Sequence, residues 1–219
     1  MSVLHDSALK VLLDGLHAKS DRQIAELERF QAGQATHPST DDEIKAFRSD
    51  KLVALDRDKA EFCYQLCCAT NARRIVEIGT SFGVSTLYLA AAVRDNVRAS
   101  GGSGVVIGTE YEPAKANAAR AHFEQAGLSN LIDLREGDLR ETLSTIEGPV
   151  DFMLVDIWIR MARPALELVT PRLRRGAIVI CDNTARFRAD YADYFAFLES
   201  NGFRTMTLPF DGGLELSIR

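Results

Sequence analysis

The chain has 219 residues, of which 46% are hydrophobic and 26% are charged, and its formal net charge is −5. This composition is that of a globular domain and excludes collagen-like, coiled-coil and disordered chains. The acidic balance argues against nucleic acid as the main partner, because a phosphate backbone attracts basic surfaces. With neither a long apolar run nor a signal-peptide pattern at its start, the sequence predicts a cytoplasmic protein with no membrane partner.

The first quarter of the sequence predicts helices. Four leucines recur at helical spacing within residues 3–31, and a further helix is predicted around 55–71. Residues 32–44 between them are rich in loop-forming residues. We therefore divide the chain into an N-terminal helical extension, 1–50, and a main domain, 51–219. The apolar stripe of the first helix must be covered, and we expect it to cover a substrate pocket or a second subunit.

From residue 73 onward, short β-rich runs alternate with helical stretches. Several of these strands are apolar on both faces, as a buried parallel sheet requires. Near the end of the chain, two strand-like runs flank a glycine-rich turn, which is typical of an antiparallel hairpin. The sequence thus predicts an α/β fold, with a doubly wound sheet of five parallel strands, a C-terminal antiparallel hairpin and N-terminal helices. The parallel strands are predicted at 74–80, 104–111, 131–138, 150–156 and 176–183, with helices near 84–95, 113–127, 139–147, 161–173 and 188–201.

The glycine-rich turn after the first predicted strand allows three interpretations. A dinucleotide site needs G-x-G-x-x-G, but Ser81 and Val84 stand where its second and third glycines belong. The letters Gly79-Thr-Ser81-Phe-Gly83 match the G-x-S-x-G turn of hydrolases. That mechanism needs a histidine after the acid, whereas the last histidine of the chain is His122. Both interpretations are therefore disfavoured.

The third interpretation is a nucleoside-type cofactor without a pyrophosphate. Carboxylates stand at the ends of three successive predicted strands, at Glu77, Glu110 and Asp138. Open α/β sheets bind ligands at the carboxyl ends of their strands, and an acid at the second strand end can hold both hydroxyls of a ribose. Glu77 lies inside the turn and suits a ligand that carries an amine or a positive charge. The alternative is that Glu77 and Glu110 only cap the helices that follow them.

These motifs together resemble the class I S-adenosylmethionine-dependent methyltransferases, and within them the small O-methyltransferases of the catechol type. The resemblance covers about residues 50–219 and rests on VEIGTSFGVSTLYLA, GTEYEPAKANAARAHFEQAGL, EGD, VDFMLVD and GAIVICDN, in that order. It implies a Rossmann-like fold, S-adenosyl-L-methionine as cofactor, a small-molecule acceptor and a homodimer.

The resemblance also assigns roles to single residues. It implies that Glu77 and Gly79 frame the methionine part of the cofactor, with Ser81 and Ser85 near its carboxylate. Glu110 would bind the ribose, Tyr111 and Asp138 would lie against the adenine, and Trp158 would pack beside that ring. The cofactor-binding residues expected from the resemblance are Glu77, Gly79, Ser81, Ser85, Glu110, Tyr111, Asp138, Asp156 and Trp158.

A metal site is predicted at the next two strand ends. Asp156 ends the fourth predicted strand and Asp182-Asn183 ends the fifth, so three oxygen ligands of the kind that Mg²⁺ prefers should meet there. In the catechol-type family these positions hold a divalent cation that binds the acceptor oxygens. The alternative is that Asp182-Asn183 forms a turn and Asp156 caps a helix.

One position departs from the family pattern. The family's Asp-x-Trp-Lys carries a lysine that acts as general base, whereas this chain has Ile159 there. The neighbouring Arg160 stays protonated and cannot replace that lysine. Proton removal would then fall to the metal, to Asp156 as the candidate catalytic residue, or to no residue. The expected function is methyl transfer to a hydroxyl oxygen, and the alternative is a non-catalytic cofactor-binding or interaction protein.

Overall fold

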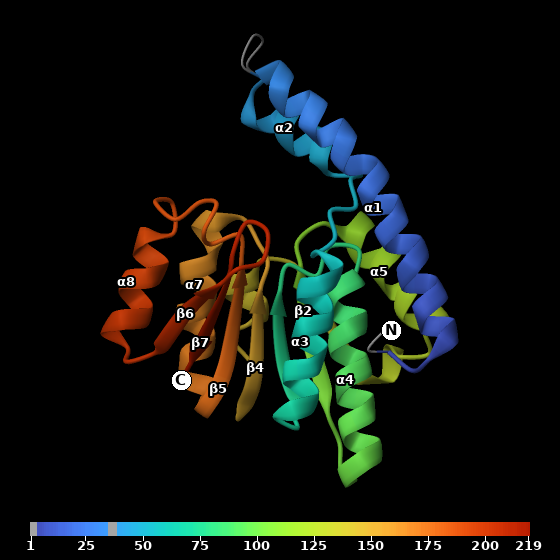
Figure 1. The fold of residues 1–219 in the computed structure, drawn as a ribbon, viewed down its shortest axis with the longest axis vertical. Coiled ribbons are helices and arrows are strands. Elements are labelled where there is room, and N and C mark those ends of the chain that lie inside the picture. Colours follow the sequence, from blue (N-terminus) through green and yellow to red (C-terminus); the bar gives the residue numbers. More distant parts are fainter. Residues whose placement is uncertain (1–3, 35–38) are drawn as a thin grey trace.

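A seven-stranded mixed sheet forms the centre of the molecule in the computed structural model, which describes residues 4–34 and 39–219 (Figure 1). The strand order is β3-β2-β1-β4-β5-β7-β6, and the pairs among β1 to β5 are parallel. β7 pairs antiparallel with β5 and β6, which confirms the predicted C-terminal hairpin. The strands are β1 Arg74–Ile78, β2 Val105–Glu110, β3 Ile132–Glu136, β4 Val150–Val155, β5 Leu173–Asp182, β6 Arg204–Leu208 and β7 Leu214–Ile218.

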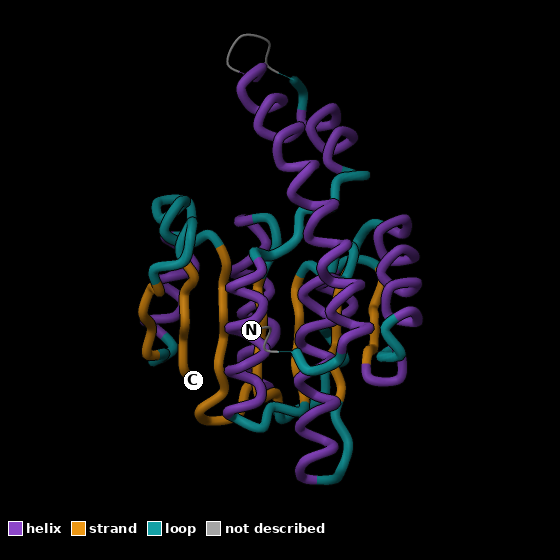
Figure 2. Tube along the Cα trace, turned by 45° about the vertical axis from the view of Figure 1, so that its right-hand side comes forward, coloured by secondary structure: helices purple, strands orange, loops and turns teal. Residues whose placement is uncertain are grey.

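Helices cover both faces of the sheet, because the strands are apolar on both sides. On β1, Ile75 belongs to one buried cluster and its neighbour Val76 to the other, so successive side chains point to opposite faces. Helices α3 (Arg57–Ala69), α4 (Val84–Ser100) and α5 (Pro113–Gln125) contribute to the first cluster. Helices α6 (Leu139–Thr142), α7 (Ile159–Val169) and α8 (Ala192–Ser200) contribute to the second. Figure 2 shows the sheet between these two helical layers.

The N-terminal helix α1 (Ser7–Gln34) packs on the main domain along only part of its length. Leu9, Leu13 and Leu16 are buried in the same apolar cluster as α4, so the predicted stripe of α1 covers the core. The C-terminal half of α1 extends beyond the sheet together with helix α2 (Asp41–Arg48), as Figure 1 shows. The rings of Phe30 and Phe47 stack between α1 and α2 at a centroid distance of 4.0 Å.

The prediction of a loop over residues 32–44 is wrong at 32–34 and at 41–44, which are helical, whereas 39 and 40 lie outside any helix. α1 continues to Gln34, and α2 starts at Asp41, while 35–38 lie outside the described residues. The start of α2 is a capping box, in which Thr40 accepts from the backbone N–H of Glu43 and the Glu43 carboxylate accepts from that of Thr40. This local signal was outweighed by the surrounding loop-forming residues.

The helix predicted at 139–147 is also wrong in length, since α6 ends at Thr142. The guanidinium of Arg135 donates to the Thr142 carbonyl at 2.7 Å and so satisfies one of the carbonyl groups that the end of the helix leaves free. Across the described ranges, no helix has both the length and the apolar character that crossing a bilayer requires.

Candidate functional site

The turn after β1 has a backbone that side chains other than glycine rarely allow. Gly79 has a φ of +93°, and a Cβ on it would clash with the Asp156 carbonyl oxygen. Ser81 also lies in the left-handed region, with a φ of +49°, and Gly83, at +81°, is the N-cap of α4. The turn therefore holds the ends of β1 and β4 together and leads directly into the N-terminus of a helix, where free N–H groups favour anionic ligand groups.

Glu77 is fully buried beneath this turn. Its Oε2 accepts hydrogen bonds from the Thr80 hydroxyl at 3.0 Å and from the Thr86 hydroxyl. Its Oε1 has no hydrogen-bond partner among the described residues. Burial raises the pKa of the Glu77 carboxyl, since desolvation disfavours the ionised form. Ser85, in the first turn of α4, is also buried, and its nearby hydroxyl lowers the pKa of this carboxyl, against the larger effect of burial. An unpaired buried carboxylate oxygen is a place where a ligand amine can donate a hydrogen bond.

Glu110 ends β2 and is held by backbone N–H groups. One carboxylate oxygen accepts from Ser81 N at 2.7 Å, and the other accepts from Glu112 N at 2.8 Å. Glu110 therefore supports the turns around it, as the capping alternative expects. A carboxylate can accept about four hydrogen bonds, so this arrangement leaves acceptor capacity on both oxygens for a ligand hydroxyl.

Asp138 is engaged by its own helix. It caps α6 by accepting from Arg140 N at 2.9 Å, and both of its oxygens pair with the Arg140 guanidinium. These contacts lower the pKa of Asp138 to about 2, the hydrogen bond from the Arg140 side chain having the largest effect. Two exposed aromatic rings follow β2 and β4, the strands on either side of β1; Tyr111 is 64% exposed and Trp158 52%. Contact of Asp138, Tyr111 and Trp158 with an adenine stays a prediction.

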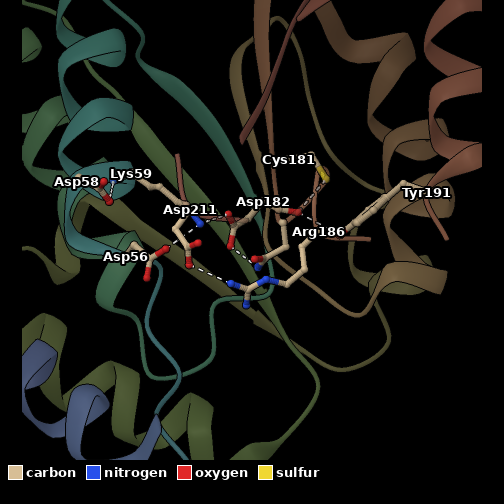
Figure 3. Close-up of polar contacts among 9 residues, drawn as sticks. Asp56, Asp58, Lys59, Cys181, Asp182, Arg186, Tyr191 and Asp211 are labelled. Atoms are coloured by element: carbon tan, nitrogen blue, oxygen red, sulfur yellow. Dashed lines mark hydrogen bonds and ion pairs between the residues drawn. The ribbon is translucent and has the colours of Figure 1, made fainter. Parts of the chain in front are cut away.

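The fifth strand end contains a residue that sequence reasoning missed. The ammonium of Lys59, on α3, lies 2.7 Å from Asp182 Oδ1 and 2.7 Å from Asp56 Oδ2 (Figure 3). Lys59 is only 1% exposed. On α3, Lys59 falls in line with the buried Cys63 and Cys67 at four-residue spacing, and a lysine in such an apolar stripe is the signal that could have found it.

Asp156 lies near this ion pair. Burial is the largest cause of a raised pKa at Asp156, which reaches about 8, and the negative charges of Asp182 and Glu77 add to it. The positive charge of Lys59 acts in the opposite direction. The acids at the ends of β1, β4 and β5 thus influence one another electrostatically: Glu77 and Asp182 are buried, Asp156 is half-buried, and the buried ammonium of Lys59 lies among them.

The predicted ligands Asp156, Asp182 and Asn183 do not fit a divalent cation as they are arranged. Lys59 pairs with one oxygen of Asp182, and the Asn183 amide donates to the other at 2.6 Å. Within the described residues, no group of three or more histidine, cysteine or acidic side chains is placed to hold a metal ion. Asn183 has a φ of +59° and its carbonyl accepts from Phe187 N, in agreement with the alternative of a turn.

The family's base position also lacks a proton acceptor. Ile159 is the first residue of α7 and packs against the second apolar cluster, while Arg160 is exposed. Asp156 is therefore the residue near the β4 end whose chemistry best fits proton transfer, and its catalytic role stays a prediction.

A cavity of about 330 Å³ lies between α1 and the segment that leads into α3. Asp56 belongs both to the wall of this cavity and to the ion pair with Lys59. The cavity wall thus includes residues of α1 together with Asp56, and Asp56 is linked through Lys59 to Asp182 at the end of β5. The polar residues in its wall are Asp14, His17, Ser20, Asp21, Asp56 and Arg57.

Comparison with known proteins places this architecture among methyltransferases. Residues 76–184 match the methyltransferase domain family. The chain is 32% identical over 135 residues to the catechol O-methyltransferase of Mycobacterium tuberculosis, which covers 61% of this chain and 58% of that protein. It is 26% identical over 147 residues to the catechol O-methyltransferase of Niastella koreensis, which covers 60% of this chain and 63% of that protein. The chain thus matches less than two thirds of the length of either curated relative.

Solved structures share the fold at lower identity. An O-methyltransferase of Bacillus cereus in complex with SAH superposes with a TM-score of 0.68 at 19% identity, covering 99% of this chain and 93% of that one. The O-methyltransferase TomG of Streptomyces achromogenes, in complex with SAM, gives a TM-score of 0.68 at 21% identity, covering 82% and 90%. These similarities confirm the predicted Rossmann-like fold.

Proposed function

Because this chain belongs to the class I S-adenosylmethionine-dependent methyltransferases, we propose that it transfers a methyl group from S-adenosyl-L-methionine to a hydroxyl oxygen of a small molecule. The observation that carries the proposal is the buried Glu77 carboxylate at the glycine turn, with one oxygen unpaired among the described residues. A cofactor that carries both an amine and a sulfonium suits a buried acid at a strand end.

The described residues fit this cofactor in two parts. On the methionine side, Glu77 would accept from the amine, while Gly79, Ser81 and Ser85 form the turn and the helix N-terminus that would receive the carboxylate. On the nucleoside side, Glu110 would accept from the ribose hydroxyls. Bound there, the cofactor supplies an activated methyl group, and the task of the chain is to align the acceptor oxygen with it.

The nucleoside side would be completed by residues from two further loops. Tyr111 follows β2 and Trp158 follows β4, so their exposed rings can cover a flat base from the solvent side. Asp138 would need to accept from the adenine amine while it keeps its ion pair with Arg140. This proposal rests on the place of the three residues after the carboxyl ends of β2, β3 and β4.

For the acceptor, we propose the cavity between α1 and the segment before α3 as the entrance. A neutral hydroxyl is a weak nucleophile, so its proton must leave during the transfer. Asp156 is the proposed acceptor of that proton, because Ile159 cannot take it. The Mg²⁺ ion expected from the sequence stays a prediction without support from the arrangement of Asp182 and Asn183.

A methyl-transfer assay tests the proposed function. The protein is incubated with S-adenosylmethionine labelled in its methyl group and with a panel of catechols and phenols, and the labelled product is measured. We expect labelled product with at least one acceptor, and formation of one S-adenosylhomocysteine for each methyl group transferred. Binding of S-adenosylhomocysteine without turnover on any acceptor would favour the non-catalytic alternative.

The homodimer, the cytoplasmic location and the boundary between residues 50 and 51 are proposals as well. The part of α1 and α2 that extends beyond the sheet offers a surface to a second subunit, with Ile24 37% exposed. Sedimentation of the full chain, and of a chain that starts at Lys45, would test the dimer. We expect the full chain to sediment as a dimer, and a full-length monomer would contradict this proposal.

A further inference from the structure

The ammonium of Lys59 is buried, although a lysine ammonium exposed to water would avoid the free-energy cost of desolvation. Removing an ammonium from water is expensive unless carboxylates pair with it. Lys59 has two such partners, Asp56 and Asp182, both at 2.7 Å from Nζ. The buried ammonium of Lys59 therefore balances the negative charge of these carboxylates, which would otherwise be unpaired.

The charge that it balances comes from the ends of the parallel strands. Glu77 and Asp182 are buried acids at the ends of β1 and β5, and Asp156 follows β4. The Asp182 carboxylate has its two oxygens engaged by Lys59 and by the Asn183 amide. One cation thus already lies within contact of the acid that the sequence predicts as a metal ligand.

We propose that Lys59 is the resident cation of the acceptor side, and that its ammonium takes the place of the divalent ion that the sequence predicts at Asp156, Asp182 and Asn183. Lys59 acts here as a positioning residue, because it touches Asp182 and Asp56. It joins the N-terminus of α3 to the end of β5 and keeps Asp56 in the wall of the cavity.

This assignment has a consequence for the class of acceptor. A divalent ion with open positions can hold two neighbouring oxygens of one acceptor, as a catechol offers. An ammonium already paired with two carboxylates cannot chelate in this way. A chain with this resident cation should therefore accept a single hydroxyl group as readily as a vicinal pair. The inference rests on the proposed function for its reaction, but binding of a metal tests it without turnover.

Titration with Mn²⁺, followed by the loss of its free paramagnetic signal, tests the proposal on the full chain. We expect the wild-type protein to bind no stoichiometric Mn²⁺ at this site. The Lys59→Ala variant opens space beside two unbalanced acids, so we expect it to bind one equivalent. The Lys59→Arg variant keeps the charge and should behave as the wild type. Adding Asp182→Asn to Lys59→Ala should abolish the binding gained.

Thermal unfolding gives a second measurement of Mn²⁺ binding at this site. Mn²⁺ should raise the melting temperature of Lys59→Ala by mass action and leave that of the wild type unchanged. One equivalent of Mn²⁺ on the wild type, lost in Asp182→Asn, would overturn the proposal. Folded Lys59→Ala without Mn²⁺ binding would overturn it too. If Lys59→Ala does not fold, the wild-type and Asp182→Asn titrations decide, since binding contradicts the proposal and its absence supports it.

Discussion

The acids at the ends of β1 and β2 are held by neutral donors, whereas the acid at the end of β5 is held by a buried ammonium. Glu77 accepts from threonine hydroxyls, and Glu110 accepts from two backbone N–H groups. Asp182 instead pairs with Lys59 at 2.7 Å. Neutral donors orient a carboxylate without cancelling its charge. The first pair of strand ends therefore keeps a negative charge for a cationic ligand, while the β5 end has its charge balanced within the chain.

The largest expected effect comes from removing the balancing charge. Lys59→Ala should lower the free energy of unfolding by about 3–5 kcal/mol, because breaking a buried pair leaves an uncompensated charge. The matched control is Lys10→Ala, which removes an exposed pair with Asp14 at 2.6 Å and should cost less than about 1 kcal/mol. Denaturant unfolding of both variants measures the difference. Equal losses would mean that the β5 end does not depend on its internal cation.

The opposite behaviour is expected at the β1 end. Glu77→Gln should weaken binding of S-adenosylhomocysteine by about 1.5–3 kcal/mol, since a charged hydrogen bond to the ligand amine is lost. Its stability at neutral pH should equal or exceed that of the wild type, because the amide avoids the cost of burying a charge. Calorimetric titration and thermal unfolding give the two values. Loss of stability with unchanged affinity would reverse the assignment.

The pH dependence of the Glu77 variant follows from the raised pKa of that carboxyl. A raised pKa in the folded state favours the protonated form, so its contribution is fully present below the pKa of the unfolded chain. That contribution is lost as the pH rises through the folded pKa. The stability of Glu77→Gln relative to the wild type should therefore increase with pH over this window. A difference that does not change with pH would contradict the burial effect.

A smaller effect is expected at the β2 end. Glu110→Ala should weaken binding of S-adenosylhomocysteine by about 1–3 kcal/mol, through loss of the hydrogen bonds to the ribose. Glu136→Ala is the control at the end of β3, where the acid pairs with Arg120 at a surface position. That control should leave affinity within the error of the titration. Undiminished affinity in Glu110→Ala would remove Glu110 from the binding site.

The smallest effect is expected at Asp138. Asparagine can cap a helix as aspartate does, and the ion pair with Arg140 is exposed, so Asp138→Asn should change stability by less than about 1 kcal/mol. If Asp138 contacts the adenine, the variant should also weaken the binding of S-adenosylhomocysteine by about 0.5–1 kcal/mol. Titration of this variant separates a ligand contact from a purely local cap. Unchanged affinity would leave Asp138 with the cap alone.

The residues that sequence reasoning placed well are those whose signals are local. Glycines in a turn after a strand, and acids such as Glu77 and Glu110 at strand ends, can be identified within a few letters of the sequence. The order of alternating strands and helices then places these ends along one edge. The capping box at Thr40 is equally local, and it shows that a short signal can be outweighed by its surroundings.

The residue that sequence reasoning could not place is Lys59. It lies on a helix before β1, and its partner Asp182 ends the last parallel strand, so only the folded sheet brings the two together. A motif that lists Asp156, Asp182 and Asn183 carries no information about a cation from elsewhere in the chain. Charge balance in a buried site is set by the whole fold, and a family motif read alone therefore favoured a metal.

Calorimetric titration of S-adenosylhomocysteine into the full chain, first with EDTA and then with excess Mg²⁺, tests the central claim most directly. An uncancelled negative charge at the β1 and β2 ends, together with a balanced β5 end, predicts one binding site per chain with the same affinity in both conditions. No binding in either condition would contradict the methyltransferase site itself. Binding that requires Mg²⁺ would contradict the balance of charge that Lys59 provides.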